Sequence, residues 1–134
     1  MLRLDDRWAW DHWLVDDGSA YRLFFLQAPR SLGDPDLRHV NATVGHAIST
    51  DLVGWTLLPD ALNAGLPGTW DDLATWTGSI VHDGSRWVLC YTGCNRAERN
   101  AGSTPNSTPM NAATPNASPT DVAVTCVGNE DDAA

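Results

Sequence analysis

Two segments of the chain, 66 positions apart, repeat the same β-hairpin pattern. In each segment an apolar run reaches an Asp-Gly turn and continues into a strand rich in aromatic and aliphatic residues. The matched positions are Val15 and Val81, Asp17 and Asp83, Gly18 and Gly84, Ser19 and Ser85, Tyr21 and Trp87, Leu23 and Leu89, and Phe25 and Tyr91. A repeated hairpin of one type indicates an array or a β-propeller. The alternative is two unrelated hairpins that both use Asp-Gly turns.

The first part of the chain is predicted to be all-β. The hairpins should be antiparallel and turn at Asp17-Gly18 and Asp83-Gly84, because Asp-Gly supplies the positive φ angles of tight turns. After the third strand we expect a turn through residues 49–51 and a second short strand. Residues 56–72 are interpreted as a loop, since two prolines and two glycines interrupt them. Strands are expected at residues 10–15, 20–27, 42–48, 77–82 and 86–92.

The end of the chain differs in composition. Of the 26 residues at 95–120, 22 are Asn, Ala, Gly, Ser, Thr or Pro, and every Trp, Tyr and Phe lies at or before Tyr91. Such a segment buries too little apolar surface to offset the entropy cost of ordering. We therefore expect a partial β-propeller region over residues 1–94. Residues 95–134 are expected to be a low-complexity, disordered tail that offers one short possible strand.

Charge and targeting patterns narrow the classes of partner that the chain could bind. The chain has a net charge of −9, with eight Arg and no Lys, which argues against a nucleic-acid partner because that needs a clustered basic surface. No apolar run approaches the ~20 residues of a membrane span, and no signal-peptide pattern is visible. We therefore expect no membrane partner and a cytoplasmic location. Cys90 and Cys94 have weak metal-ligand spacing and no adjacent His, so neither a metal nor another cofactor is expected.

The segment WAWDHW, residues 8–13, surrounds an aspartate with tryptophans. Burying an ionised carboxylate against apolar surface is costly unless the carboxylate is paired or hydrogen-bonded. Two settings tolerate Asp11 here: a turn where it faces water, or a pocket where it meets a ligand. Sugars suit the second setting, because indole faces cover their C–H patches while carboxylates address the hydroxyls and the anomeric carbon.

Five segments in order, WDHW, YRLFFLQAP, VGHAISTDLVGWTLLPDAL, WTGS and WVLCYTG, resemble glycoside hydrolase family 32. That family shares a five-bladed β-propeller with family 68 and, more distantly, with family 43. The similarity covers residues 8–94 and implies the first one to two blades of such a propeller. It also implies a carbohydrate partner, a fructose-containing oligo- or polysaccharide, and retaining β-fructosidase-type hydrolysis of O-glycosidic bonds in carbohydrate metabolism.

The resemblance further implies roles for individual residues. Asp11 stands where the family has its nucleophilic aspartate, and we expect its side chain to converge with those of Gln27 and Trp76 in one pocket. Alternatively, Gln27 is a strand-end polar residue and Trp76 a blade-core residue. His46 is expected to be structural and hydrogen-bonded near a turn. The implied sugar-pocket residues are Trp10, Trp13, Gln27, which matches a glutamine at the cleavage point, His39, near a position usually held by a pocket aromatic, and the pair Trp76 and Thr77.

Two further carboxylates of the family have no match here. The chain contains no Arg-Asp-Pro, and its only glutamates, Glu98 and Glu130, lie in the low-complexity tail. Fewer than two repeats of this spacing cannot close a propeller ring, and open blade edges invite association. We therefore expect a truncated product that is inactive alone, since no acid protonates the leaving group. The alternatives are a family 43-like arabinosidase or xylosidase and a non-catalytic carbohydrate-binding module.

Overall fold

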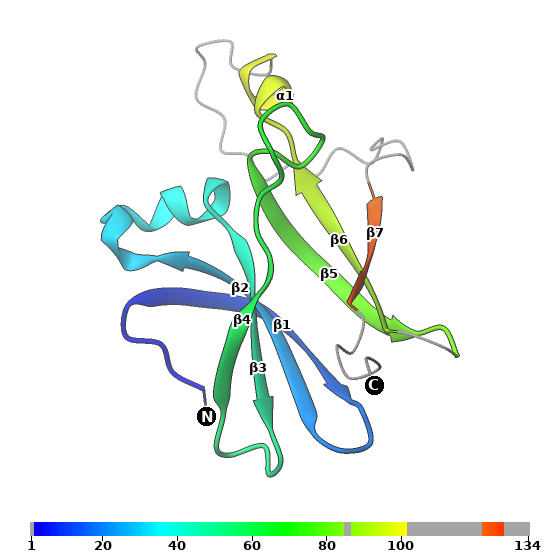
Figure 1. Cartoon of the computed structure of the whole chain (residues 1–134). Helices are drawn as coiled ribbons and strands as arrows, with labels where there is room; N and C mark the ends of the chain where they lie inside the picture. Colours follow the sequence, from blue (N-terminus) through cyan, green and yellow to red (C-terminus); the bar gives the residue numbers. More distant parts are fainter. Residues whose placement is uncertain (1, 85–86, 102–121, 128–134) are drawn as a thin grey trace.

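The computed structural model describes residues 2–84, 87–101 and 122–127, which form two antiparallel β-sheets (Figure 1). The first sheet has the order β1-β2-β3-β4 and the second the order β5-β6-β7. The strands are β1 (Arg7–Asp16), β2 (Tyr21–Pro29), β3 (Thr43–Ser49), β4 (Thr56–Leu62), β5 (Ala74–His82), β6 (Trp87–Cys94) and β7 (Val122–Val127). The 3-10 helices are η1 (Arg30–Leu32) and η2 (Pro35–Val40), and the α-helix is α1 (Arg96–Ala101).

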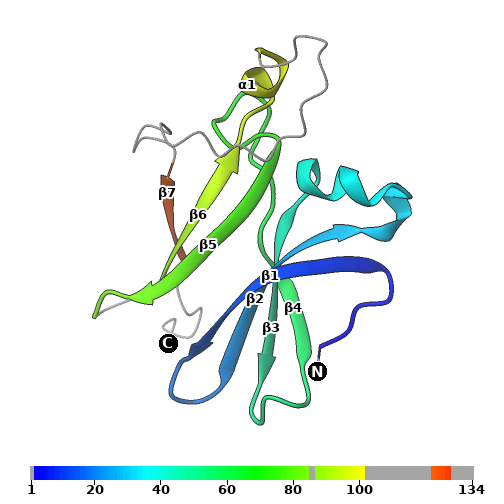
Figure 2. The ribbon, with the colours of Figure 1, turned by 180° about the vertical axis from the view of Figure 1, so that it is seen from behind.

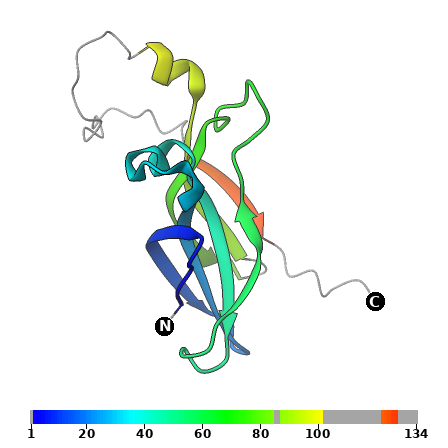
Figure 3. The same ribbon diagram turned by 90° about the vertical axis from the view of Figure 1, so that its left-hand side faces the viewer.

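The second sheet meets the first through β5, which contacts β1, β2 and β3 (Figure 2). The 3-10 helices and α1 lie at one end of the molecule, whereas the β1–β2 and β3–β4 turns point to the other end (Figure 3). None of the helices in the described ranges is long and apolar enough to cross a membrane. The expected all-β architecture, with consecutive antiparallel hairpins, is confirmed.

The two repeated hairpins are built alike. β1 pairs with β2 and β5 pairs with β6, with the predicted turns between the strands. Gly18 (φ +86°) and Gly84 (φ +102°) are both left-handed, a conformation that glycine adopts at little cost. Each first strand also has a register shift at the same place in the repeat, at residues 10–12 and at residues 76–78. The shared irregularity favours one repeated unit over two unrelated hairpins.

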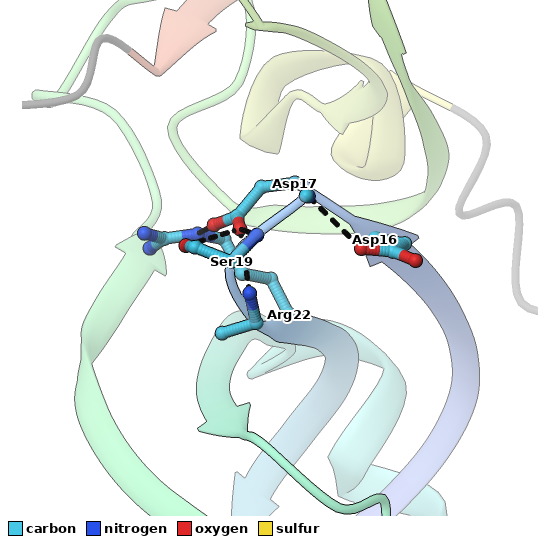
Figure 4. Close-up of polar contacts among 6 residues, drawn as sticks. Asp16, Asp17, Ser19 and Arg22 are labelled. Carbon is cyan, nitrogen blue, oxygen red and sulfur yellow. Dashed lines mark hydrogen bonds and ion pairs between the residues drawn. The ribbon is translucent and has the colours of Figure 1, made fainter.

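The carboxylate of Asp17 holds the β1–β2 turn together (Figure 4). One oxygen accepts hydrogen bonds from the backbone N–H groups of Ser19 (2.9 Å) and Ala20 (2.8 Å), and the other accepts from the Arg22 guanidinium. Burial alone raises the pKa of Asp17, but the hydrogen bonds from Arg22 and Ser19 outweigh it and hold this pKa well below its ordinary value. The turn therefore keeps its charged clamp at neutral pH.

Strand β4 corrects the prediction that residues 56–72 are a loop, because Thr56–Leu62 pair with β3. The second short strand that we expected directly after residue 51 is instead a turn, in which Ser49 Oγ and the Asp51 carboxylate accept backbone N–H bonds. Pro59 is tolerated because β4 is at the sheet edge and its register with β3 shifts there. Residues 56–62 form a strand because they pair with β3, and the local composition does not reveal that pairing.

Two segments of the predicted tail form regular elements: helix α1 corrects the prediction of disorder, and β7 is the short possible strand that the sequence offered. Helix α1 follows Asn95, whose side-chain oxygen accepts a hydrogen bond from the N–H two residues on (2.7 Å) and caps the first turn. Strand β7 has the sequence VAVTCV, rich in β-branched residues, and extends the sheet beside β6. Residues 102–121 and 128–134, where disorder was also predicted, lie outside the described residues.

Three flat rings stack across neighbouring strands of the first sheet. Trp13 lies over Phe24 (centroids 6.4 Å apart, interplanar angle 18°), and Phe24 lies over His46 (4.5 Å, 10°). Phe24 belongs to a buried core with Val15, Leu26 and Val44, and Trp13 packs against this core. His46 is therefore structural, as predicted, but its buried Nε2 has no hydrogen-bond partner among the described residues. The predicted hydrogen bond is wrong, because ring stacking rather than a turn positions His46.

The free energy of unfolding should depend on pH through the protonation of His46. Burial, aided by the positive charge of Arg22, lowers the pKa of His46 from 6.5 to about 4. As pH falls from 6.5 towards 4 the unfolded chain takes up a proton that the folded chain resists, so stability decreases. We expect His46→Phe, which keeps a flat ring on Phe24, to remove a loss of about 1–2 kcal/mol in this range. Urea unfolding of both proteins at pH 7.5 and 4.5 measures the difference; equal pH dependence contradicts it.

Candidate functional site

Asp11 occupies the bulge in β1. The pairing of β1 with β2 skips Asp11, since Trp10 pairs with Leu26 and His12 pairs with Phe25. Its φ is +37°, a left-handed conformation that costs a non-glycine residue energy. A bulge re-aims the side chain away from the alternation of the strand, and Asp11 is exposed. Strain at one exposed carboxylate marks Asp11 as a candidate functional residue.

Thr77 holds the Asp11 carboxylate from the second hairpin. Its hydroxyl donates a hydrogen bond to Asp11 Oδ2 at 2.9 Å. Thr77 is 66 positions after Asp11 and occupies the equivalent bulge in β5. The repeat therefore places two bulge residues face to face where β1 and β5 adjoin. The hydrogen bond fixes one carboxylate oxygen, and the other has no partner within the described residues.

Trp10, Trp76 and His39 meet close to this pair. The Trp76 indole N–H donates to the His39 carbonyl oxygen at 2.6 Å, and the Trp10 and His39 rings meet edge to face with centroids 6.0 Å apart. Both indoles pack on the buried cluster of Ala42, Leu73 and Ala74. Trp76 thus contributes to packing between the blades, which was the alternative prediction for this residue. It also lies beside the bulge.

Gln27 is buried at 2% exposure, near the end of β2. Its Nε2 donates to Asp60 Oδ1 at 2.7 Å and to Thr43 Oγ1 at 3.3 Å. Arg7 also approaches Asp60, with 3.6 Å between its guanidinium and Oδ1. Asp60 was missed from the sequence because its segment was interpreted as a loop. The signal available was a single acidic residue within the apolar run LLPDAL.

The predicted site residues lie in different surroundings. Gln27 faces a cavity of about 270 Å³ for which neither Asp11 nor Trp76 is a lining residue. The convergence of these three side chains in one pocket stays a prediction. Trp13 lies in the ring stack on Phe24. The cavity is lined by Asp6, Arg7, Gln27, Ala28, Pro29, Asn41, Thr43 and Asp60.

Asp71 and Asp72 anchor a loop instead of facing a ligand. The Tyr91 hydroxyl donates to Asp71 Oδ2 at 2.7 Å. The backbone N–H groups of Arg96 (2.8 Å) and Gly68 (2.9 Å) donate to Asp72, and they hold the pKa of Asp72 below its ordinary value. Asp72, held in its ionised form, is therefore a poor proton donor. No group of three His, Cys, Asp or Glu able to hold a metal occurs in the described ranges.

The two paired sheets have a counterpart among solved structures. A chain described as a glycoside hydrolase has the same fold, with a TM-score of 0.53 and 23% identity over 73% of this chain and 26% of that one. The two sheets are therefore the first blades of a β-propeller fold. The model of the family described as "Glycosyl hydrolases family 32 N-terminal domain" matches residues 13–124. The chain belongs to glycoside hydrolase family 32.

Curated relatives are similar over parts of their length. A fructan 6-exohydrolase of Beta vulgaris is 30% identical over 108 residues, 63% of this chain and 18% of that protein. An acid beta-fructofuranosidase, AIV-18, of Capsicum annuum is 48% identical over 56 residues, 40% and 8% respectively. A 6(G)-fructosyltransferase of Asparagus officinalis is 38% identical over 76 residues, 54% and 11%. The chain thus spans less than a fifth of the length of these relatives.

Proposed function

We propose that this chain supplies the nucleophile-bearing blades of a retaining glycosidase that acts on fructose-containing sugars, with Asp11 as nucleophile. The observation that carries the proposal is the hydrogen bond from Thr77 to Asp11, two bulge residues of equivalent position in the two blades. Membership of family 32 and the fructofuranosidase and fructosyltransferase names of its relatives support a fructosyl substrate. The family match also favours this reading over the family 43 alternative.

In this proposal the unpaired oxygen of Asp11 attacks the anomeric carbon of the fructosyl unit. The bond to the leaving oxygen breaks through an oxocarbenium-like transition state while a second carboxylic acid protonates that oxygen. A fructosyl ester of Asp11 results, and water then hydrolyses it. Thr77 keeps the attacking carboxylate in place, which lowers the entropy cost of reaching the transition state. Trp10 and Trp76 offer indole surface next to the bulge for the sugar.

The acid is assigned to neither Asp71 nor Asp72. Backbone N–H bonds favour the ionised form of Asp72, and the Asp71 carboxylate is buried and engaged by the Tyr91 hydroxyl. General acid catalysis is worth about 10²–10⁴ in rate. We therefore expect the 134-residue chain to bind fructose-containing sugars without measurable hydrolysis of sucrose. A partner or further residues that provide an acid opposite Asp11 would restore hydrolysis.

A titration of the indole N–H signals tests the sugar-binding part of this proposal. In protein labelled with ¹⁵N-tryptophan, we expect sucrose and a fructo-oligosaccharide to shift the Trp10 and Trp76 signals, whereas Trp87, on the distant end of β6, stays in place. Trp10→Phe and Trp76→Phe assign the signals. Xylo-oligosaccharide serves as the control sugar. Equal shifts with xylo-oligosaccharide, or none with either fructosyl sugar, contradict the proposal.

A further inference from the structure

The side chain of Gln27 crosses one strand to reach another. Gln27 is on β2, and its partner Asp60 is on β4, with β3 between them. The crossing is possible because Gly45 of β3 has no side chain. A Cβ there would lie 2.9 Å from Gln27 Cδ and 2.5 Å from Phe25 Cε2, closer than packed atoms permit.

The irregular pairing of β4 brings Asp60 into reach. Between the pairs His46–Leu58 and Val44–Leu62 the β4 strand contains two residues more than β3. Such a bulge turns side chains away from the regular alternation, and Asp60 lies within it. Three separate features, the bulge, the glycine and the carboxylate, thus converge on one glutamine amide.

The chemistry of this contact fixes which way the amide faces. An ionised carboxylate only accepts hydrogen bonds, so Asp60 pairs with the Nε2 end of Gln27 and excludes the opposite orientation. Arg7, at 3.6 Å, keeps a positive charge beside Asp60. Gln27 Oε1 has no donor among the described residues. The amide therefore offers an acceptor to the cavity.

We infer that Asp60 is a positioning residue that makes Gln27 a fixed hydrogen-bond acceptor for a hydroxyl group of the bound sugar. The inference rests on the proposed function for the identity of the ligand. The role of Asp60 is to hold the amide orientation in advance, so that binding does not have to select it. A freely rotating amide would present its donor and its acceptor in turn.

Two substitutions at Asp60 separate positioning from general structure. Asp60→Asn keeps an oxygen that accepts from Nε2, and Asp60→Leu removes it while filling similar space. Asp5→Asn is the matched control, because it removes an exposed negative charge that contacts Arg3 at 3.8 Å and is not among the residues lining this cavity. Gln27 is the only glutamine of the chain, so ¹⁵N-glutamine labelling reports its side-chain amide protons without assignment.

We expect Asp60→Leu to move both Gln27 amide signals and to weaken sucrose binding about tenfold or more, while Asp60→Asn and Asp5→Asn stay within about threefold. Moved signals with unchanged sucrose affinity in the Leu variant overturn the inference and leave the proposed function intact. If the wild type does not bind sucrose, the proposed function and the sugar role of Asp60 both fail. Amide signals that stay unchanged in Asp60→Leu refute the positioning itself.

Discussion

Asp11→Asn abolishes fluoride release from β-fructofuranosyl fluoride, a donor chosen because fluoride departs without a proton. With this donor the absent acid is not needed, so wild-type chain is expected to form the ester at Asp11 and release fluoride. Asparagine has no charge with which to attack, and we expect a loss of about 10³-fold or more, to the rate of a protein-free solution. A fluoride electrode measures the rate.

The fold should survive this substitution. Asparagine has the same shape, tolerates a left-handed φ and still accepts a hydrogen bond from Thr77, so the melting temperature should stay within about 2 °C. Asp5→Asn removes an exposed carboxylate whose contact is Arg3, at 3.8 Å, and serves as the matched control. Undiminished fluoride release by Asp11→Asn eliminates Asp11 as the nucleophile.

Gly78→Ala is expected to cause the largest loss of stability. A Cβ at Gly78 would lie 2.0 Å from the carbonyl oxygen of Cys90 and 3.0 Å from Tyr91 Cα. These are backbone atoms of the paired strand, so relief requires β5 and β6 to separate. We expect a loss of about 3 kcal/mol or more in the free energy of unfolding.

The same change should disturb the site, because Gly78 follows Thr77 in the bulge. Gly54→Ala is the matched control: its Cβ would have only Asp51 carboxylate oxygens nearby, at 3.8 and 3.9 Å, and we expect an effect within about 0.5 kcal/mol. Denaturant unfolding measures both variants. Equal stability of the two proteins contradicts the close approach of β5 and β6 at this glycine.

The hairpins were predictable from the sequence because their information is local. Asp-Gly turns and apolar alternation fix where the strands reverse, and the spacing of the repeat predicted two similar units. Strand β4 was not predictable in the same way: Pro59 argues against a strand unless the neighbour β3 and its irregular register are known. Helix α1 depends likewise on a capping side chain, which composition does not reveal, whereas the apolar run of β7 indicated a short possible strand.

For the candidate site, too, the residues in local motifs were predictable and those that depend on neighbouring strands were not. Asp11 and Thr77 were both found from motifs, and the repeat in retrospect explains why they meet, since equivalent bulges bring them together. Asp60 was missed because its role depends on Gly45 of the neighbouring strand β3. The residues next to Asp60 in the sequence do not reveal this role. Trp13 was assigned to the sugar pocket, but its pairing with Phe24 places it in the ring stack.

The central claim is that Asp11, held by Thr77 across the two blades, is the nucleophile. Its most direct test is mass spectrometry of the chain after incubation with β-fructofuranosyl fluoride, followed by peptide mapping. We predict one added fructosyl unit on the peptide that contains Asp11, and none on the Asp11→Asn protein. A fructosyl unit on any other residue, or an unmodified wild-type chain, contradicts the claim.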